Sequence, residues 1–106
     1  VMAYGAVIFD GDPNYAVIRG EWLSKDNYVV LHRLAVSNKY KNMGVATLFM
    51  QRVEELARKD GVPAFRVDTN FDNVAMRRVF LKQKFIQCGE VTVGDGTPRI
   101  AYEKLL

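Results

Sequence analysis

The chain has 106 residues, a formal net charge of +3, 49% hydrophobic residues and 25% charged residues. This length allows one domain with a modest core, and no apolar run approaches the ~20 residues that span a bilayer. The positive charges are spread along the chain, without the cluster that nucleic-acid binding needs. The single cysteine, Cys88, excludes an internal disulfide and favours a reducing compartment, here the cytoplasm.

The first third of the chain predicts three strands. Residues 4–10 are apolar and β-branched and end at a turn cluster, residues 15–23 alternate moderately, and residues 28–36 are the most apolar. The last of these runs is typical of a central strand. Because short turns link the three runs, we expect them to pair in antiparallel order.

A helix, a strand and a second helix follow. Residues 45–59 place apolar side chains on one helical face and end before Gly61 and Pro63. Residues 64–69 predict a strand, which a right-handed crossover makes parallel to the strand before the helix. The second helix is expected to begin near Asp72 as its N-cap. Residues 85–93 and 99–105 then predict a C-terminal hairpin.

The segment from residue 34 to residue 46 is an apolar strand, a basic turn and a helix start made of small residues. The first N–H groups of a helix lack intrahelical partners and lie at its positive end. Gly44 and Ala46 are small where a phosphate would approach the backbone, and Lys39 and Lys41 add attraction for an anion. The segment therefore predicts a site for a phosphate-bearing ligand.

This turn resembles the acyl-CoA pyrophosphate loop of the GNAT acetyltransferases, with the pattern Arg/Gln-x-x-Gly-x-Gly/Ala. Lysine replaces the first residue of that pattern, and the matching positions are Lys41, Asn42, Met43, Gly44, Val45 and Ala46. Residues 32–36 resemble the family's bulged central strand, Asn73 its Asn-containing second motif, and residues 82–85 its Glu-Lys-x-Gly-Phe ending, with Lys84 in place of Gly.

The resemblance implies an α/β (α+β) fold. Its mixed sheet has antiparallel strands, a central parallel pair that splays at the CoA cleft, two helices and a C-terminal hairpin. Residues 1–106 would form a single acetyltransferase domain that lacks the family's first strand and first two helices. In the family, those elements form one wall of the groove for the acceptor substrate.

The resemblance also implies acetyl-CoA as co-substrate. The pantetheine would pair with the backbone near Leu34 and Val36, and a backbone N–H near Ala35 or Val36 would hold the oxyanion. The amide of Asn73 would bind the pantetheine or a neighbouring backbone group, and Phe80 stands where the family often has a proton-donating Tyr. One histidine and one cysteine make no credible metal site.

His32 and Glu21 are the candidate catalytic residues. His32 matches a catalytic histidine of the serotonin N-acetyltransferase branch, whereas the glutamate base of histone-type members would align with Val30. A histidine in a strand is also often structural, and that alternative stays open. Glu21, expected on the strand beside the central one, would bind an amine or relay a proton with His32, or it is simply solvated.

The expected function is transfer of an acetyl group from acetyl-CoA to a primary amine of a small molecule or peptide, by direct attack in a ternary complex. The alternative is a CoA-binding sensor or scaffold module without catalysis. No nucleic-acid or membrane partner is expected. The amine acceptor and the existence of a homodimer stay open.

If Gly44 is small to admit phosphates, Gly44→Val weakens acetyl-CoA binding without unfolding the protein. Calorimetric titration of the folded variant measures the change. An unchanged affinity would contradict the assignment of the pyrophosphate site.

Overall fold

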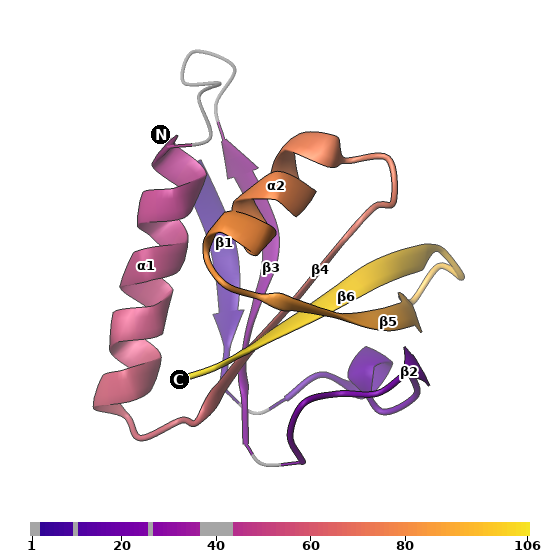
Figure 1. Cartoon of the computed structure of the whole chain (residues 1–106), viewed down its shortest axis with the longest axis horizontal. Helices are drawn as coiled ribbons and strands as arrows, with labels where there is room; N and C mark the ends of the chain where they lie inside the picture. The colour runs from indigo at the N-terminus through magenta and orange to yellow at the C-terminus, as the bar shows by residue number, and fades with distance from the viewer. Residues whose placement is uncertain (1–2, 10, 26, 37–43) are drawn as a thin grey trace.

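The computed structural model describes residues 3–9, 11–25, 27–36 and 44–106. It contains a mixed six-stranded sheet in the order β1-β3-β4-β6-β5-β2 (Figure 1). The elements in chain order are β1 (Ala3–Ile8), the 3₁₀ turn η1 (Pro13–Tyr15), β2 (Arg19–Gly20), β3 (Val29–Val36), α1 (Gly44–Lys59), β4 (Ala64–Thr69), α2 (Val74–Lys82), β5 (Ile86–Thr92) and β6 (Pro98–Leu105). The expected mixed sheet, two helices and C-terminal hairpin are confirmed.

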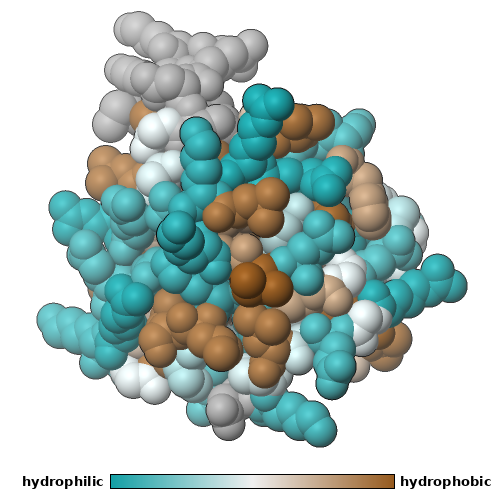
Figure 2. All heavy atoms as spheres, in the orientation of Figure 1, coloured by the Kyte–Doolittle hydropathy of each residue, from teal (hydrophilic) through white to brown (hydrophobic). Residues whose placement is uncertain are grey.

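Both helices contribute to the main core, which lies on one face of the sheet. Alternate residues of β3, β4 and β6 enter this core because side chains alternate between the two faces of a strand. Its members are Val29, Leu31, Ala46, Met50, Val53, Ala57, Phe65, Val67, Met76, Val79, Phe80, Phe85, Ile100 and Tyr102. Figure 2 shows brown hydrophobic side chains among teal hydrophilic ones on the side of the molecule viewed in Figure 1. No helix among the described residues is long and apolar enough to span a bilayer.

The strand expected over residues 15–23 is wrong. Asp12 caps the short turn η1, where Pro13 stands at the first position, and only Arg19–Gly20 pairs as a strand. A continuous strand would put Tyr15 and Trp22 on opposite faces, but their ring centroids lie 5.1 Å apart. This aromatic contact therefore bends the segment. β2 pairs with β5 at the far edge of the sheet, and β1 alone of the first strands pairs with β3.

A buried ion pair organises the second face of the sheet. Arg66 on β4 and Glu103 on β6 are directly paired across the strands, and Arg66 Nε donates to Glu103 Oε2 at 3.0 Å. Their side chains are 5% and 0% exposed. Charges buried this deeply are costly unless their remaining hydrogen-bonding groups are also satisfied.

The segment between β2 and β3 satisfies those groups. Glu103 accepts hydrogen bonds from the backbone N–H groups of Leu23 and Ser24 and from the Ser24 hydroxyl. Arg66 Nη2 donates to the carbonyl of Ser24 at 2.7 Å. The guanidinium carbon lies 4.1 Å from the Trp22 ring centroid and 3.9 Å from that of Tyr28. The ion pair thus fixes this segment against the sheet.

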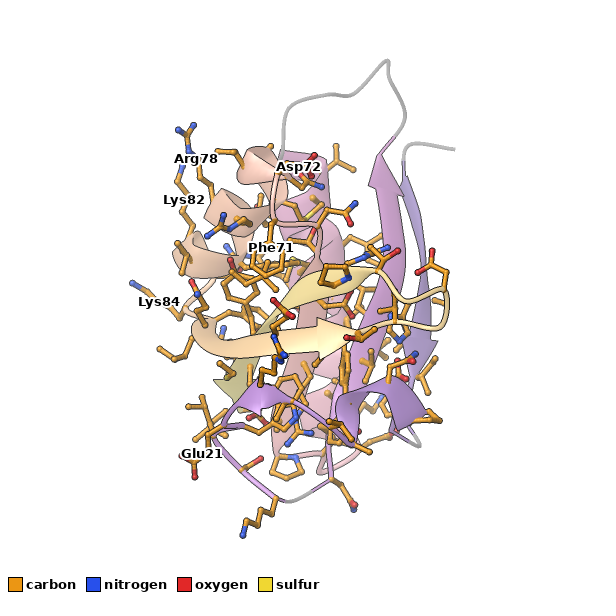
Figure 3. The ribbon with its side chains drawn as sticks, turned by 90° about the vertical axis from the view of Figure 1, so that its right-hand side faces the viewer. Glu21, Phe71, Asp72, Arg78, Lys82 and Lys84 are labelled. Carbon is orange, nitrogen blue, oxygen red and sulfur yellow. The ribbon has the colours of Figure 1, made fainter. Side chains whose placement is uncertain are left out.

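Helix α2 begins one residue later than the sequence suggests. Asn73, not Asp72, is its N-cap, and the Asn73 side chain accepts a hydrogen bond from the N–H of Met76 at 3.1 Å. After the helix, Lys84 has φ 71°, in the left-handed region that favours glycine. Figure 3 shows Lys84, Lys82 and Arg78 pointing away from the body of the protein.

Glu103→Gln is expected to lower the free energy of unfolding by about 3 kcal/mol, because it leaves the Arg66 charge buried without a counter-ion. Chemical denaturation measures this difference. The control is Glu55→Gln, which breaks the exposed Arg52–Glu55 pair and is expected to cost less than about 1 kcal/mol. Equal effects of the two substitutions would contradict the role given to the buried pair.

Candidate functional site: a cleft between two parallel strands

The only parallel neighbours among the described strands are β3 and β4, and they separate along their length. Their register contains two pairs, Val29↔Phe65 and Val30↔Arg66. Both strands then continue, β3 to Val36 and β4 to Thr69, and Figure 1 shows them diverging toward their carboxyl ends. The expected splay of the central pair is therefore confirmed.

A cavity of about 200 Å³ lies where the strands diverge. Leu31, Val67, Met76 and Phe80 belong to the core beneath the helices. Asp68 and Arg99 occupy strand positions adjacent to core residues and so belong to the opposite face. The complete lining is Leu31, Val67, Asp68, Thr69, Asn70, Asn73, Met76, Phe80 and Arg99. Residues of both faces of the sheet therefore meet at this cavity.

Strand β3 carries a bulge beside the cleft. Tyr4 pairs with Ala35 and Ala6 pairs with His32, so β3 holds one extra residue opposite Gly5. A Cβ at Gly5 would lie 2.8 Å from a methyl carbon of Leu31, which explains why a residue without a side chain stands there. A bulge interrupts the strict alternation of a strand. At this point of β3, the face on which a side chain lies therefore does not follow from residue spacing alone.

The predicted phosphate loop falls partly outside the described residues. Lys41, Asn42 and Met43 are not among the described residues. For Leu34, Ala35 and Val36 the structure describes the backbone, which belongs to β3, but not the side chains. Helix α1 begins at Gly44, which is exposed, and its first turn contains no acidic residue. The start of this helix therefore carries no carboxylate that would repel an anion.

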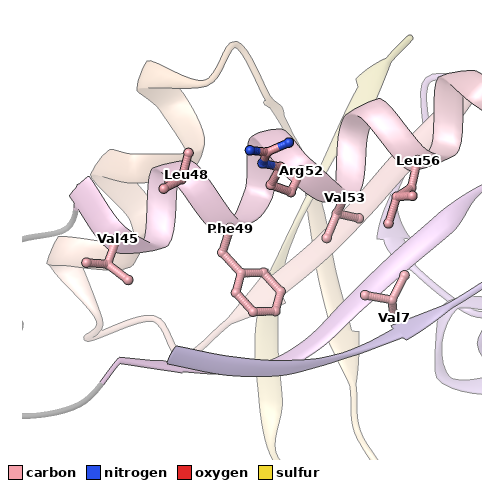
Figure 4. A pocket seen from close by; sticks show the side chains of 7 residues that line it. All are labelled: Val7, Val45, Leu48, Phe49, Arg52, Val53 and Leu56. Carbon is pink, nitrogen blue, oxygen red and sulfur yellow. The ribbon is translucent and has the colours of Figure 1, made fainter. Parts of the chain in front are cut away.

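Ala46 and Val45 pack against other parts of the protein. The side chain of Ala46 is 0% exposed in the main core, so packing also requires a small residue there. Val45 lines an apolar groove of about 450 Å³ between α1 and β1 (Figure 4). The groove is formed by Val7, Val45, Leu48, Phe49, Arg52, Val53 and Leu56. The side chain of Val45 thus lies apart from the cleft.

Asn73 and Phe80 lie at the cleft. Both line the cavity between β3 and β4. The side-chain oxygen of Asn73 accepts the hydrogen bond that caps α2. The side-chain NH₂ group takes no part in this cap. Phe80 is 3% exposed, and its ring centroid lies 5.0 Å from that of Tyr102. Phe80 therefore forms an apolar wall.

His32 lies within a cluster of polar side chains on the second face. Its Nε2 forms a hydrogen bond with the carboxylate of Asp12, and its Nδ1 lies 3.9 Å from Asp68 Oδ2. The Tyr15 hydroxyl donates to Asp68 Oδ2 at 2.5 Å, and Arg99 Nη1 donates to Asp68 Oδ1 at 3.4 Å. The side chains of His32, Asp12 and Asp68 are 21%, 6% and 4% exposed. A partly accessible imidazole thus lies between two buried carboxylates.

Burial raises the pKa of Tyr15 well above its usual value of 10.0, and the negative charge of Asp68 raises it further. The hydroxyl therefore stays protonated and acts as a donor to Asp68. Asp12, Tyr15 and Asp68 are not among the site residues predicted from the sequence. For Asp68 a signal existed, since a carboxylate inside an otherwise apolar strand needs a partner when buried.

Glu21 does not lie beside His32. It follows β2, which three other strands separate from β3, and its side chain is exposed. Figure 3 shows Glu21 pointing outward at the end of the molecule opposite Asp72. The expectation that Glu21 stands on the strand next to the central one is wrong, because β2 pairs with β5. The relay between Glu21 and His32 has no support in this geometry.

The model of the acetyltransferase (GNAT) family matches residues 2–85, and the chain belongs to this family. An acetyltransferase of the GNAT family from Streptococcus agalactiae 2603 is 36% identical to the chain, with a TM-score of 0.84. The match covers 99% of this chain and 59% of that one. The chain therefore spans about three fifths of the length of this relative.

Two further solved structures share the fold at lower identity. A GNAT acetyltransferase from Listeria monocytogenes 4b F2365 is 20% identical with a TM-score of 0.74, covering 100% of this chain and 58% of its own. The NatC complex bound to Gag peptide and CoA is 13% identical with a TM-score of 0.76, covering 99% of this chain and 61% of its own. At these identities the likeness concerns the fold.

Tyr15→Phe is expected to lower the free energy of unfolding by about 1.5–3 kcal/mol near neutral pH, because a hydrogen bond to a charged group is lost. The raised pKa of Tyr15 means that the folded protein keeps a proton that the unfolded chain loses near pH 10. Wild-type stability should therefore fall above about pH 10, and the difference from Tyr15→Phe should narrow there. Chemical denaturation at several pH values measures the difference in free energy of unfolding between the two proteins. A difference that grows above pH 10 would contradict the raised pKa of Tyr15.

Proposed function

We propose that the protein transfers the acetyl group of acetyl-CoA to a primary amine. The observation that carries this proposal is the cavity between β3 and β4, where core residues from the helix side meet Asp68 and Arg99 from the opposite face of the sheet. Membership of the acetyltransferase family supports the reaction class. The NatC complex, which shares the fold, was solved with both CoA and a peptide, and this supports two ligands meeting in one cleft.

The residues of the cleft fit an acyl-CoA thioester. Beyond Val30, β3 pairs only with β1 among the described strands, which leaves its β4-facing edge available to an extended ligand. The start of α1 supplies N–H groups for phosphates. Leu31, Val67 and Phe80 offer an apolar wall beside the gap. Acetyl-CoA would supply the activated acetyl group, and the protein would hold the two reactants in line.

His32 would accept the proton of the amine. The lone pair of the neutral amine nitrogen forms a bond to the acetyl carbon, and the carbonyl π electrons move to oxygen, where a backbone N–H near Ala35 or Val36 would stabilise the charge. His32 takes the proton that the nitrogen then carries. When the carbonyl re-forms, the C–S bond breaks and its electron pair leaves with sulfur.

The leaving thiolate needs a proton. Phe80 has none to give, so the proton comes from the imidazolium of His32 or from water. The products are the N-acetyl amine and free CoA thiol, and no covalent enzyme intermediate forms. This route assigns His32 both proton transfers or leaves the second one to solvent.

His32→Ala is expected to lower kcat/KM by about 10²- to 10⁴-fold, the usual contribution of a general base. The measurement is release of free thiol from acetyl-CoA with a panel of primary amines. Binding of acetyl-CoA, followed by calorimetry, should change little, because His32 lies on the face opposite the helices.

Wild-type protein that binds acetyl-CoA but releases no thiol with any amine would favour the sensor or scaffold alternative. A folded His32→Ala variant with normal turnover would remove His32 from the mechanism. Glu55→Gln, a substitution on the exposed surface of α1, serves as the control that should leave turnover unchanged.

A further inference from the structure

Asp12 contacts the one histidine of the chain from a segment far away in the sequence. It lies in the turn after β1, and its carboxylate Oδ2 forms a hydrogen bond with Nε2 of His32 on β3. We infer that Asp12 is a positioning residue, which holds His32 in the tautomer that leaves Nδ1 free to accept a proton. This inference rests on the proposed acetyl transfer and concerns the residue that prepares its base.

The carboxylate of Asp12 is itself held in place. Its Oδ1 accepts a hydrogen bond from the N–H of Asn14 at 2.8 Å and caps η1. The backbone N–H of Asp12 donates to the Tyr28 hydroxyl at 3.1 Å. With Oδ1 and the backbone both engaged and the side chain 6% exposed, Oδ2 presents a fixed acceptor to the imidazole.

A fixed carboxylate beside Nε2 determines which ring nitrogen carries the proton. A carboxylate can only accept, so Nε2 of the neutral ring must be the N–H donor and Nδ1 must hold the lone pair. Nδ1 faces Asp68 at 3.9 Å, which is beyond hydrogen-bond distance. Asp68 lines the cavity between β3 and β4, so the free lone pair lies on the side of the ring nearest the cleft.

The groups around Asp68 keep it from replacing Asp12 in this role. Asp68 already accepts hydrogen bonds from the Tyr15 hydroxyl and from Arg99. The Tyr15 ring lies beside the imidazole, with centroids 5.9 Å apart, and limits rotation of the ring. Asp12 therefore orients the imidazole through Nε2, while Tyr15, Asp68 and Arg99 form the surroundings of Nδ1.

Asp12→Asn is the decisive variant. The asparagine oxygen can still cap η1, since Asn is as good an N-cap as Asp. Its NH₂ group would meet Nε2 as a donor, which requires the proton to move to Nδ1 and removes the lone pair from the cleft side. We expect kcat to fall about 10²- to 10⁴-fold, with the KM for acetyl-CoA and the thermal unfolding midpoint near their wild-type values.

Nitrogen-15 NMR of the imidazole reads the tautomer without reference to activity. At a pH where the ring is neutral, wild-type protein should show the proton on Nε2, and Asp12→Asn should show it on Nδ1. A wild-type ring protonated on Nδ1 would overturn the inference even if the variant failed to fold. Asp60→Asn, in the exposed turn after α1, is the matched control and should change neither the spectrum nor kcat.

The two proposals fail in different ways. If His32→Ala retains normal turnover, the base of the proposed reaction is wrong, whatever the tautomer. If His32→Ala is inactive but Asp12→Asn keeps both the wild-type tautomer and the wild-type kcat, the base stands and the positioning role of Asp12 is overturned. Loss of kcat together with the changed tautomer supports both.

Discussion

The second face of the sheet depends on the buried ion pair between Arg66 and Glu103. Neither charge is tolerable there alone, and the backbone of the segment before β3 completes their hydrogen bonds. That segment carries Trp22, which packs on Tyr15, and Tyr15 in turn binds Asp68. Arg66 and Asp68 both lie on β4, two residues apart. The orientation of Asp68 and Tyr15 beside His32 therefore depends on the ion pair between Arg66 and Glu103.

The spacing of hydrophobic residues correctly predicted the helices and strands that bury one regular apolar face or run. Residues 64–69 are the observed β4, and the first helix starts within one residue of its expected position. Residues 15–23 alternate as a strand does, but the contact between Tyr15 and Trp22 overrides this local pattern and only Arg19–Gly20 pairs as a strand. The same misplaced segment accounts for the error over Glu21, whose position depends on which strand β2 pairs with.

Site residues that belong to a local sequence motif could be predicted. Site residues that only the tertiary fold brings together could not. Asn73 and Phe80 were identified from motif spacing and line the cleft. Asp12 and Asp68 are 56 positions apart, and only the pairing of β1 with β3 and of β3 with β4 brings both to His32. Asp68 in an apolar strand indicates that it needs some partner when buried, but no local pattern says that this partner is His32, and Asp12 alone is compatible with an exposed turn.

The short ladder between β3 and β4 divides the sheet into two mechanical halves. One half is β1 and β3, and the other is β4, β6, β5 and β2; backbone pairing joins them at Val29↔Phe65 and Val30↔Arg66. An extended ligand in the gap would act as a substitute strand that continues this seam. Because such a ligand would contact both halves of the sheet, its binding would hold them together and raise the free energy of unfolding. The protein with ligand bound would then be more rigid than the free protein.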